Sequence, residues 1–175
     1  MVARSRQTSD SRGFSWLPPY NDMGLIGGIL FPMYAGFPVD LMSPQAFLRS
    51  PILCLECLTR SKATISVAPN FALDLCVENI KPEHLERLDL RAWEVCFVGA
   101  EPIRSRTLQR FSETFATCGF RAETFLPCYG LAESTLQATG GPRDVKPATL
   151  ALEPDAFERG RIVPVQDGDS AYTVV

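Results

Sequence analysis

Short apolar runs alternate with segments of helical periodicity along this chain, and this alternation restricts the possible folds more than any other feature. The apolar runs have the length of strands and occupy 14–17, 37–42, 63–68 and 93–98. The segment 104–115 shows the helical periodicity most clearly, because Leu108, Phe111 and Phe115 recur at spacings of three and four. Strand and helix signals in alternation predict an α/β fold, a layered sheet with packed helices.

Capping and turn residues mark where several helices begin and end. Asp22 is placed to cap the helix that follows the first strand, and Gly36 is placed to end it. Ser50 and Pro51 introduce a second helix, because serine caps helices and proline suits their first turn. A third helix is expected to follow the third strand at Pro69. Each predicted helix therefore comes directly after a predicted strand or strand region.

Length, composition and charge restrict the class of protein. With 46% hydrophobic residues in a chain of 175, one domain with a sizeable core can form. The formal net charge of −3 provides no positive field, so we expect no nucleic acid partner. The longest apolar stretch, 23–36, is interrupted by Pro32 and is too short for a membrane span. Residues 1–12 lack the apolar run of a secretory signal, so a cytoplasmic location is expected.

The chain divides into three regions by pattern. Residues 1–13 are expected to form a flexible tail, and 14–139 are expected to form the α/β core. From 140 onward glycines, prolines and scattered acids replace the periodic pattern, so 140–175 is expected to be irregular. Residues 171–175 resemble the opening of a strand, so we expect the chain to stop inside a larger fold.

The cysteine pattern argues against a disulfide framework and against structural zinc. Five of the six cysteines lie in apolar or periodic segments, namely Cys54, Cys57, Cys76, Cys96 and Cys128. Mostly buried, reduced thiols are therefore expected. Cys54 and Cys57 form a single C-x-x-C pair, and His84 is the only histidine, so a zinc site would lack ligands.

Three loops follow predicted strands, and in open α/β sheets ligands bind at the carboxyl ends of the strands. These loops lie at 20–24, 99–102 and 128–133. Three motifs cover them, W-L-P-P-Y-N-D-M-G-L-I-G-G at 16–28, G-A-E-P at 99–102 and C-Y-G-L-A-E at 128–133, and a fourth, P-N-F-A, lies at 69–72. In their order along the chain the motifs resemble those of fatty acyl-AMP ligases, and the similarity is continuous from about Phe14 to the C-terminus.

The resemblance implies a fragment of the large N-terminal domain of an adenylate-forming enzyme. Such an enzyme uses ATP and Mg²⁺ to convert a fatty acid to an acyl-adenylate. The acyl group then moves to an acyl carrier protein in lipid, polyketide or nonribosomal peptide synthesis. The residues that the resemblance places against ATP are Gly99, Ala100, Glu101, Pro102, Tyr129, Gly130, Leu131 and Ala132.

Tyr129 and Glu133 would have separate tasks in this site. The flat face of Tyr129 can stack on adenine, and Glu133 can supply one oxygen ligand to Mg²⁺. Without the motif, Tyr129 could equally be a buried core tyrosine, and Glu133 could be an ordinary acidic residue in the first turn of a helix. The segment 99–102 alone is equally consistent with an ordinary strand-to-helix turn.

Asn21 is the clearest departure from the family pattern, because the matching position is usually histidine. In the family this residue lies beside the reacting carboxylate, so the resemblance implies a catalytic position. Asparagine can donate a hydrogen bond but cannot become cationic, so its electrostatic contribution would be weaker. Reduced activity is the expected consequence.

The resemblance also suggests the wall of an acyl pocket. It places there Met23, Gly24, Val67, Ala68 and Phe71. Small residues are usual before P-N-F-A, so the bulk of Val67 would limit the length of the acyl chain. The alternative is that these apolar side chains are simply core.

Residues 140–175 resemble the insertion that separates fatty acyl-AMP ligases from acyl-CoA synthetases. The pattern L-E-x-x-x-x-E-R-G-R-I-V-P, taken loosely around 152–164, carries this resemblance. The resemblance implies that this insertion disfavours CoA as the acceptor. An acyl-CoA synthetase is therefore the less favoured function, and the insertion would be truncated here.

Other parts of an adenylate-forming site have no counterpart in the sequence. The segment 8–13 imitates a phosphate-binding loop, but it adjoins the P-P-Y motif, and Asp10 and Arg12 occupy positions that must be small. Because stabilising charge on phosphate is usually the largest catalytic effect, we expect the isolated chain to be inactive. The alternative function is a non-catalytic remnant, or an acyl- or nucleotide-binding module.

Overall fold

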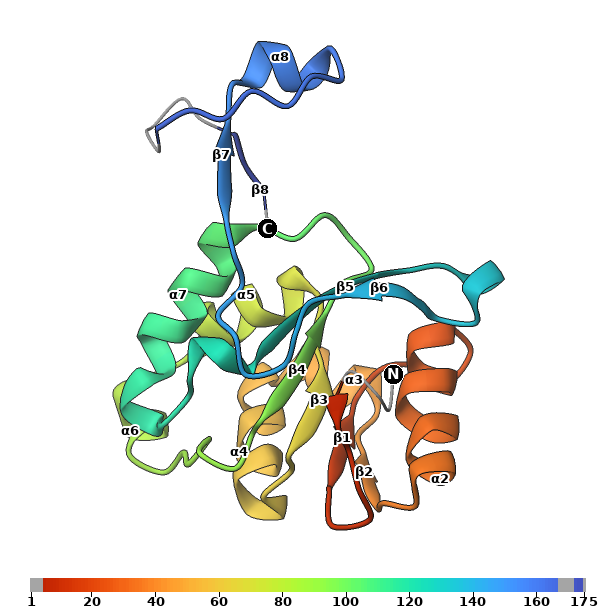
Figure 1. The fold of residues 1–175 in the computed structure, drawn as a ribbon. Coiled ribbons are helices and arrows are strands. Elements are labelled where there is room, and N and C mark those ends of the chain that lie inside the picture. The colour runs from red at the N-terminus through yellow and green to blue at the C-terminus, as the bar shows by residue number, and fades with distance from the viewer. Residues whose placement is uncertain (1–4, 167–171, 175) are drawn as a thin grey trace.

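The computed structural model describes residues 5–166 and 172–174, and its centre is a six-stranded sheet (Figure 1). The strand order is β2-β1-β3-β4-β5-β6, parallel except for β6, which is antiparallel to β5. The strands are β1 (Gly13–Ser15), β2 (Val39–Leu41), β3 (Ile65–Val67), β4 (Val95–Val98), β5 (Phe125–Gly130) and β6 (Gln137–Gly140). This arrangement confirms the predicted α/β fold, although β1 begins one residue before the predicted strand.

Helices cover one face of this sheet. The long ones are α4 (Pro51–Ser61), α5 (Asn70–Asn79) and α7 (Ser105–Phe115), and all three were expected from the sequence. Two short helices were not expected, α3 (Pro44–Arg49) and α6 (Pro82–Leu85). Single turns of 3-10 helix are η2 (Ala116–Cys118), η3 (Ala122–Thr124) and η4 (Ala132–Ser134). The apolar sides of the long helices form the main core with one sheet face.

The alternation of side chains along β4 separates two cores. Cys96 and Val98 belong to the main core beneath α4, α5 and α7. Val95 and Phe97 point to the opposite face and belong to a smaller apolar cluster. Successive residues of a strand face opposite sides of a sheet, so a strand buried on both faces is apolar throughout.

The segment after β1 forms a π-helical stretch, η1 (Met23–Leu30), that continues into α2 (Phe31–Ala35). The prediction that Asp22 caps this helix was wrong in one respect. The side chain of Asp22 makes no capping hydrogen bond, and Asn21 Oδ1 instead accepts one from the Gly24 N–H at 2.9 Å. Gly36 ends α2 with a φ of 78°, which confirms its predicted role.

The first residues of the next two helices, α3 and α4, also differ from the prediction in which serine side chain caps a helix. Ser43 caps α3, because its Oγ accepts a hydrogen bond from the Ala46 N–H at 3.2 Å. Ser50 precedes α4 as expected, but its side chain makes no capping hydrogen bond. Pro51 occupies the first turn of α4, where a missing N–H costs nothing.

The chain after β5 returns along the sheet and then leaves it (Figure 1). Cys128 and Tyr129 belong to β5 and pair with β6, so the predicted loop at 128–133 is part strand. Beyond β6, β7 (Leu150–Leu152) pairs with β8 (Tyr172–Val174), and α8 (Pro154–Glu158) follows β7. Figure 1 shows this pair standing away from the sheet. The strand expected at 171–175 is present over 172–174, and its other two residues lie outside the described residues.

The described part of the N-terminal segment contacts the chain just after β6. The Arg143 guanidinium donates to the Ser5 carbonyl at 2.6 Å and to the Glu94 carboxylate at 2.5 Å. Arg6 also forms an ion pair with Asp144. These contacts place Ser5 and Arg6 beside the segment that follows β6.

All six cysteines are free, and four of them are buried, as the sequence predicted. Burial raises the pKa of Cys76 to about 12, so this thiol stays protonated at neutral pH. Within the described ranges, 5–166 and 172–174, no helix is long and apolar enough to cross a membrane.

Candidate functional site

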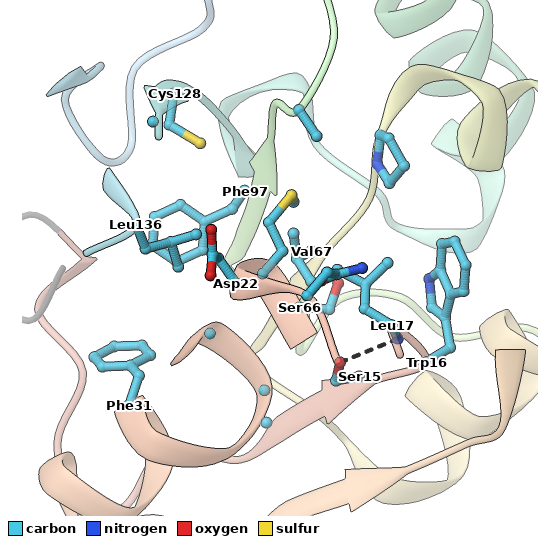
Figure 2. Close-up of a pocket in the computed structure, with 18 of the residues that line it drawn as sticks. Ser15, Trp16, Leu17, Asp22, Phe31, Ser66, Val67, Phe97, Cys128 and Leu136 are labelled. Carbon is cyan, nitrogen blue, oxygen red and sulfur yellow. Dashed lines mark hydrogen bonds between the residues drawn. The ribbon is translucent and has the colours of Figure 1, made fainter. Parts of the chain in front are cut away.

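A cavity of about 710 Å³ opens on the sheet face that α4, α5 and α7 do not cover (Figure 2). The sheet forms its floor and η1 and α2 form its side wall. Figure 2 shows Phe31, Val67, Phe97 and Leu136 around this space, with the Ser15 hydroxyl accepting a hydrogen bond from the Leu17 N–H. Most lining side chains are apolar, so the cavity suits a ligand with a large apolar part.

The loop after β4 is shaped by close backbone packing. A side chain at Gly99 would place its Cβ 2.7 Å from the Cys128 carbonyl oxygen, so only glycine fits there. Ala100 then adopts a left-handed conformation with a φ of 68°. Ala100 and Glu101 line the cavity, whereas Gly99 and Pro102 are outside the lining. A flat ligand can therefore approach the backbone at this end of the cavity.

Asn70 fixes this loop from the core. Its side chain is fully buried and bridges two backbone groups, with Nδ2 donating to the Pro102 carbonyl at 2.8 Å. Its Oδ1 accepts from the Arg104 N–H at 3.1 Å. Asn70 is the asparagine of the P-N-F-A motif, and its task in the structure is this bridge, which the sequence did not indicate.

Replacing Asn70 by leucine is expected to lower the free energy of unfolding by about 2 kcal/mol, because two backbone groups lose their partner. Urea unfolding measures the change. Asn79→Leu is the matched control, since Asn79 lies exposed at the end of α5 and bonds only to the Leu75 carbonyl. Equal effects of the two substitutions would contradict the bridging role.

Glu101 joins this loop to the start of α5. Its Oε1 accepts a hydrogen bond from the Phe71 N–H at 3.2 Å, in the first turn of that helix. A carboxylate is favourable at a helix N-terminus. Glu101 therefore has a structural partner as well as a place in the cavity wall.

The β5–β6 turn supplies the next part of the wall. Tyr129 lines the cavity with 63% of its surface exposed, so it is not the core tyrosine of the alternative interpretation. Gly130 and Leu131 also line the cavity. Ala132 and Glu133 lie in η4, exposed and outside the lining. The motif therefore contributes Tyr129, Gly130 and Leu131 to the lining, and Glu133 follows two residues after the last of them.

Asn21 and Met23 line the cavity from the η1 side, whereas Gly24 lies outside the lining. A Cβ at Gly24 would come within 2.0 Å of the Pro18 carbonyl oxygen, so this glycine allows the chain to turn closely into η1. Asn21 uses its Oδ1 to cap the helix, which leaves its Nδ2 as the group able to donate to a ligand.

The predicted acyl wall is present in part. Val67 and Phe71 line the cavity. Ala68 does not, because it belongs to the main core on the opposite sheet face. Phe97 and Leu136 complete the apolar wall and were missed, although the alternation of β4 could have indicated Phe97. Sequence reasoning gave no signal for Leu136, which lies between a turn and a polar strand.

Cys128 is a further lining residue, and its thiol is protonated and therefore a poor nucleophile. Burial raises its pKa to about 11, so at neutral pH it is protonated. Its Sγ lies 3.4 Å from the Val98 carbonyl oxygen, as a weak hydrogen-bond donor. We therefore assign Cys128 a packing role in the wall.

The lining combines two kinds of surface. Ala100, Tyr129 and Gly130 contribute backbone and an exposed aromatic face, against which a flat ring can stack. Phe31 and Phe97 are among the apolar side chains that line the same cavity. In the part of the chain that the structure describes, no cluster of three or more metal-ligating side chains is present. Glu133 is exposed and could contribute a single carboxylate, and Mg²⁺ takes only one or two carboxylates beside phosphate and water.

Comparison with known proteins identifies the class to which this fold and cavity belong. The family model described as AMP-binding enzyme matches residues 1–164, so the chain belongs to the AMP-binding enzyme family. Within it, the chain is 39% identical to the medium-chain fatty acid–acyl carrier protein ligase TtuA of Teredinibacter turnerae, over 100% of this chain and 27% of that protein. It is 40% identical to the long-chain fatty acid–AMP ligase FadD32 of Mycolicibacterium smegmatis, over 93% of this chain and 26% of that protein.

Solved structures give the same grouping. A fatty acid AMP ligase from Legionella pneumophila superposes with a TM-score of 0.94 at 44% identity, covering 98% of this chain and 30% of that one. A fatty acyl-adenylate ligase from the same species, solved with acyl adenylate and pyrophosphate, gives a TM-score of 0.93 at 45% identity and the same coverage. The chain thus resembles the fatty acyl-AMP ligases and spans about 27% of the length of its relative TtuA.

Proposed function

We propose that this chain carries the acyl-adenylate-binding part of a fatty acyl-AMP ligase. The observation that carries the proposal is that one cavity brings residues of the P-P-Y-N-D-M-G, G-A-E-P and Y-G-L-A-E segments together with an apolar wall. Adenine would lie against Ala100 and Tyr129, and the alkyl chain would extend along Val67 and Phe97. Relatives named as fatty acid ligases support this substrate class.

The chemistry of such a site would be divided between the nucleotide and the protein. ATP with Mg²⁺, when bound, supplies the electrophilic α-phosphate that the carboxylate attacks. Asn21 would donate a hydrogen bond from Nδ2 to the carboxylate, and Glu133 would supply one oxygen ligand to the metal ion. The apolar wall would exclude water from the adenylate, which would otherwise be hydrolysed.

The acceptor of the acyl group would be an acyl carrier protein in the cytoplasm. The relatives TtuA and JamA, which are named as acyl carrier protein ligases, support this acceptor. Residues 140–175, with β7 and α8, would correspond to the insertion that disfavours CoA. Residues 14–139 would form the binding core, and 1–13 a terminal segment.

Exchange of pyrophosphate into ATP tests the complete reaction. The assay would compare this chain with a chimera that adds the remaining segments of a full-length relative, each with Mg²⁺ and a series of fatty acids. We expect exchange in the chimera and none in the chain alone, because the phosphate-binding parts come from the added segments. A silent chimera that still binds fatty acids and AMP would favour the binding module over the ligase.

Replacing Tyr129 by alanine is expected to weaken AMP binding by the chain about tenfold or more, because one base–aromatic stack is lost. Isothermal titration calorimetry measures the affinity. Tyr34→Ala is the matched control, since Tyr34 is 84% exposed on α2 and outside the cavity lining. Unchanged affinity in Tyr129→Ala would remove Tyr129 from the nucleotide site.

A further inference from the structure

The turn that joins β5 to β6 contains one residue in a strained backbone conformation. Thr135 has a φ of 68° and a ψ of −55°. The Leu136 N–H donates to the Ser134 carbonyl at 2.8 Å, which closes a three-residue turn around Thr135. A γ-turn with a positive φ, near about +75° with ψ near −65°, is rare and strained. Because threonine is β-branched, a positive φ is especially unfavourable at this position.

The other residues with a positive φ do not share this strain. In the described part of the chain, the other non-glycine residues of this kind are Arg6, Lys62, Ala100 and Asp144, and none of them is β-branched. Lys62, for example, ends α4 with a φ of 52° and a ψ of 42°, which is the ordinary left-handed region. The ψ of Thr135 lies far outside that region. Thr135 therefore has an unusual backbone conformation that its own side chain opposes.

Packing fixes the two ends of this turn. Leu131 and Leu136 line the cavity on either side of it. Gly130 lies so close to the Leu136 carbonyl oxygen that a Cβ at position 130 would come within 1.7 Å of it. The ends of the turn therefore cannot move without disturbing the β5–β6 pair.

The middle of the turn, 132–135, is held much less firmly, and we call it the tip. Figure 1 shows the turn at the end of the β5–β6 pair. All residues of the tip are exposed and lie outside the cavity lining. The hydrogen bonds described for the tip join backbone groups of the turn itself. The tip can therefore change its conformation while its ends stay packed.

Glu133 belongs to this tip and lies two residues before Thr135. Among the described residues, its carboxylate has no hydrogen-bond or ion-pair partner. A rotation of the backbone at Thr135 would change the direction of the neighbouring residues of the tip. Strained residues are frequent in ligand clamps and switch regions, where the release of strain is part of the mechanism.

We propose that Thr135 is a positioning residue for Glu133. Its strained conformation belongs to the ligand-free state, and the tip relaxes when ATP binds with Mg²⁺, which brings the Glu133 carboxylate to the metal ion. This inference rests on the proposed function. The release of strain strengthens the binding of ATP with Mg²⁺, because a ligand shifts an equilibrium by its difference in affinity for the two states. AMP without a metal ion does not engage Glu133, so it leaves the tip strained.

Replacing Thr135 by glycine tests the proposal, because glycine adopts a positive φ without steric strain. The variant stabilises the ligand-free tip and so removes the contribution of strain release to binding. We expect its affinity for ATP with Mg²⁺ to fall about thirtyfold, while its affinity for AMP without metal stays unchanged. Calorimetry on the chain measures both affinities, and the unfolded state does not enter this comparison.

Three control variants separate strain from other effects of the substitution. Ser134→Gly adds similar backbone freedom to the tip without removing a positive φ, so it should weaken binding of ATP with Mg²⁺ by no more than about threefold. Thr135→Val retains the β-branch and removes only the hydroxyl, so wild-type affinities are expected. Lys62→Gly removes a positive φ at the end of α4 and should change neither affinity.

The pattern of losses decides whether strain at Thr135 positions Glu133. Equal losses in Thr135→Gly and Ser134→Gly would overturn the inference, because added flexibility would then explain both. A loss in Thr135→Val would assign the effect to the hydroxyl instead. Equal weakening of AMP and of ATP with Mg²⁺ in Thr135→Gly would show a purely structural role.

The wild-type chain separates this inference from the proposed function. If AMP binds but Mg²⁺ does not strengthen the binding of ATP, the positioning role is overturned and the adenine site stands. If AMP does not bind, both the adenine site and the positioning role are overturned.

Discussion

Replacing Phe111 by alanine is expected to lower the free energy of unfolding by about 4 kcal/mol, because it empties the centre of the main core. Phe111 is fully buried on α7. Its ring contacts those of Phe115 at 4.5 Å, Phe120 at 4.9 Å and Phe125 at 5.9 Å between centroids. Urea unfolding followed by circular dichroism measures the loss.

Met33→Ala is the control for this substitution. Met33 is 73% exposed on α2, so its truncation should change stability by less than about 0.5 kcal/mol. The contrast matters for the cavity, because the helix that carries Phe111 packs on the sheet that forms the cavity floor. A loss for Phe111→Ala as small as that for Met33→Ala would contradict the packing of α7 against the sheet.

Replacing Gly130 by alanine is expected to cost about 3 kcal/mol of stability and to abolish AMP binding. A Cβ at this position would lie 1.7 Å from the Leu136 carbonyl oxygen. Both clashing atoms belong to or directly adjoin the backbone, so no change of side-chain rotamer relieves the contact. The β5–β6 pair must shift, and Tyr129 must move with it.

The same hairpin supplies the matched control for Gly130. A Cβ at Gly141 would meet the Pro127 ring carbon at 3.7 Å, which is an ordinary contact. Gly141→Ala should therefore retain both stability and AMP affinity. Calorimetry and urea unfolding on the two variants give the comparison, and wild-type behaviour of Gly130→Ala would show that the β5–β6 register is wrong.

The sequence predicted the fold where apolar spacing was regular. Leu108, Phe111 and Phe115 indicated α7, and all three face the main core. The alternation at 93–98 indicated β4, which is buried on both faces. These elements could be predicted because a repeat of side-chain burial determines each one, independently of its distant partners.

Elements without such a repeat could not be predicted. β6 reads Gln-Ala-Thr-Gly and forms because β5 offers it an open edge for pairing. The cap of η1 was assigned to Asp22 instead of Asn21, because both side chains can cap and only the path of the chain decides between them. Tertiary context determined these details.

The residues of the candidate site also divide into those that the sequence predicted and those that it did not. The motifs located Ala100, Tyr129 and Val67, which the structure brings into one cavity. Ala68 was placed in the wall because it neighbours Val67, but adjacent strand residues face opposite sides of the sheet. Gln137 lines the cavity and was not predicted at all, since a polar residue after a turn carries no sign that its amide is buried.

The crystal structure of the chain with a non-hydrolysable dodecanoyl-adenylate analogue tests the central claim most directly. We expect adenine beside Ala100 and Tyr129, with the alkyl chain inside the cavity along Val67 and Phe97. An analogue bound outside this cavity, or with its alkyl chain directed to solvent, would contradict the assignment of the cavity as an acyl-adenylate site.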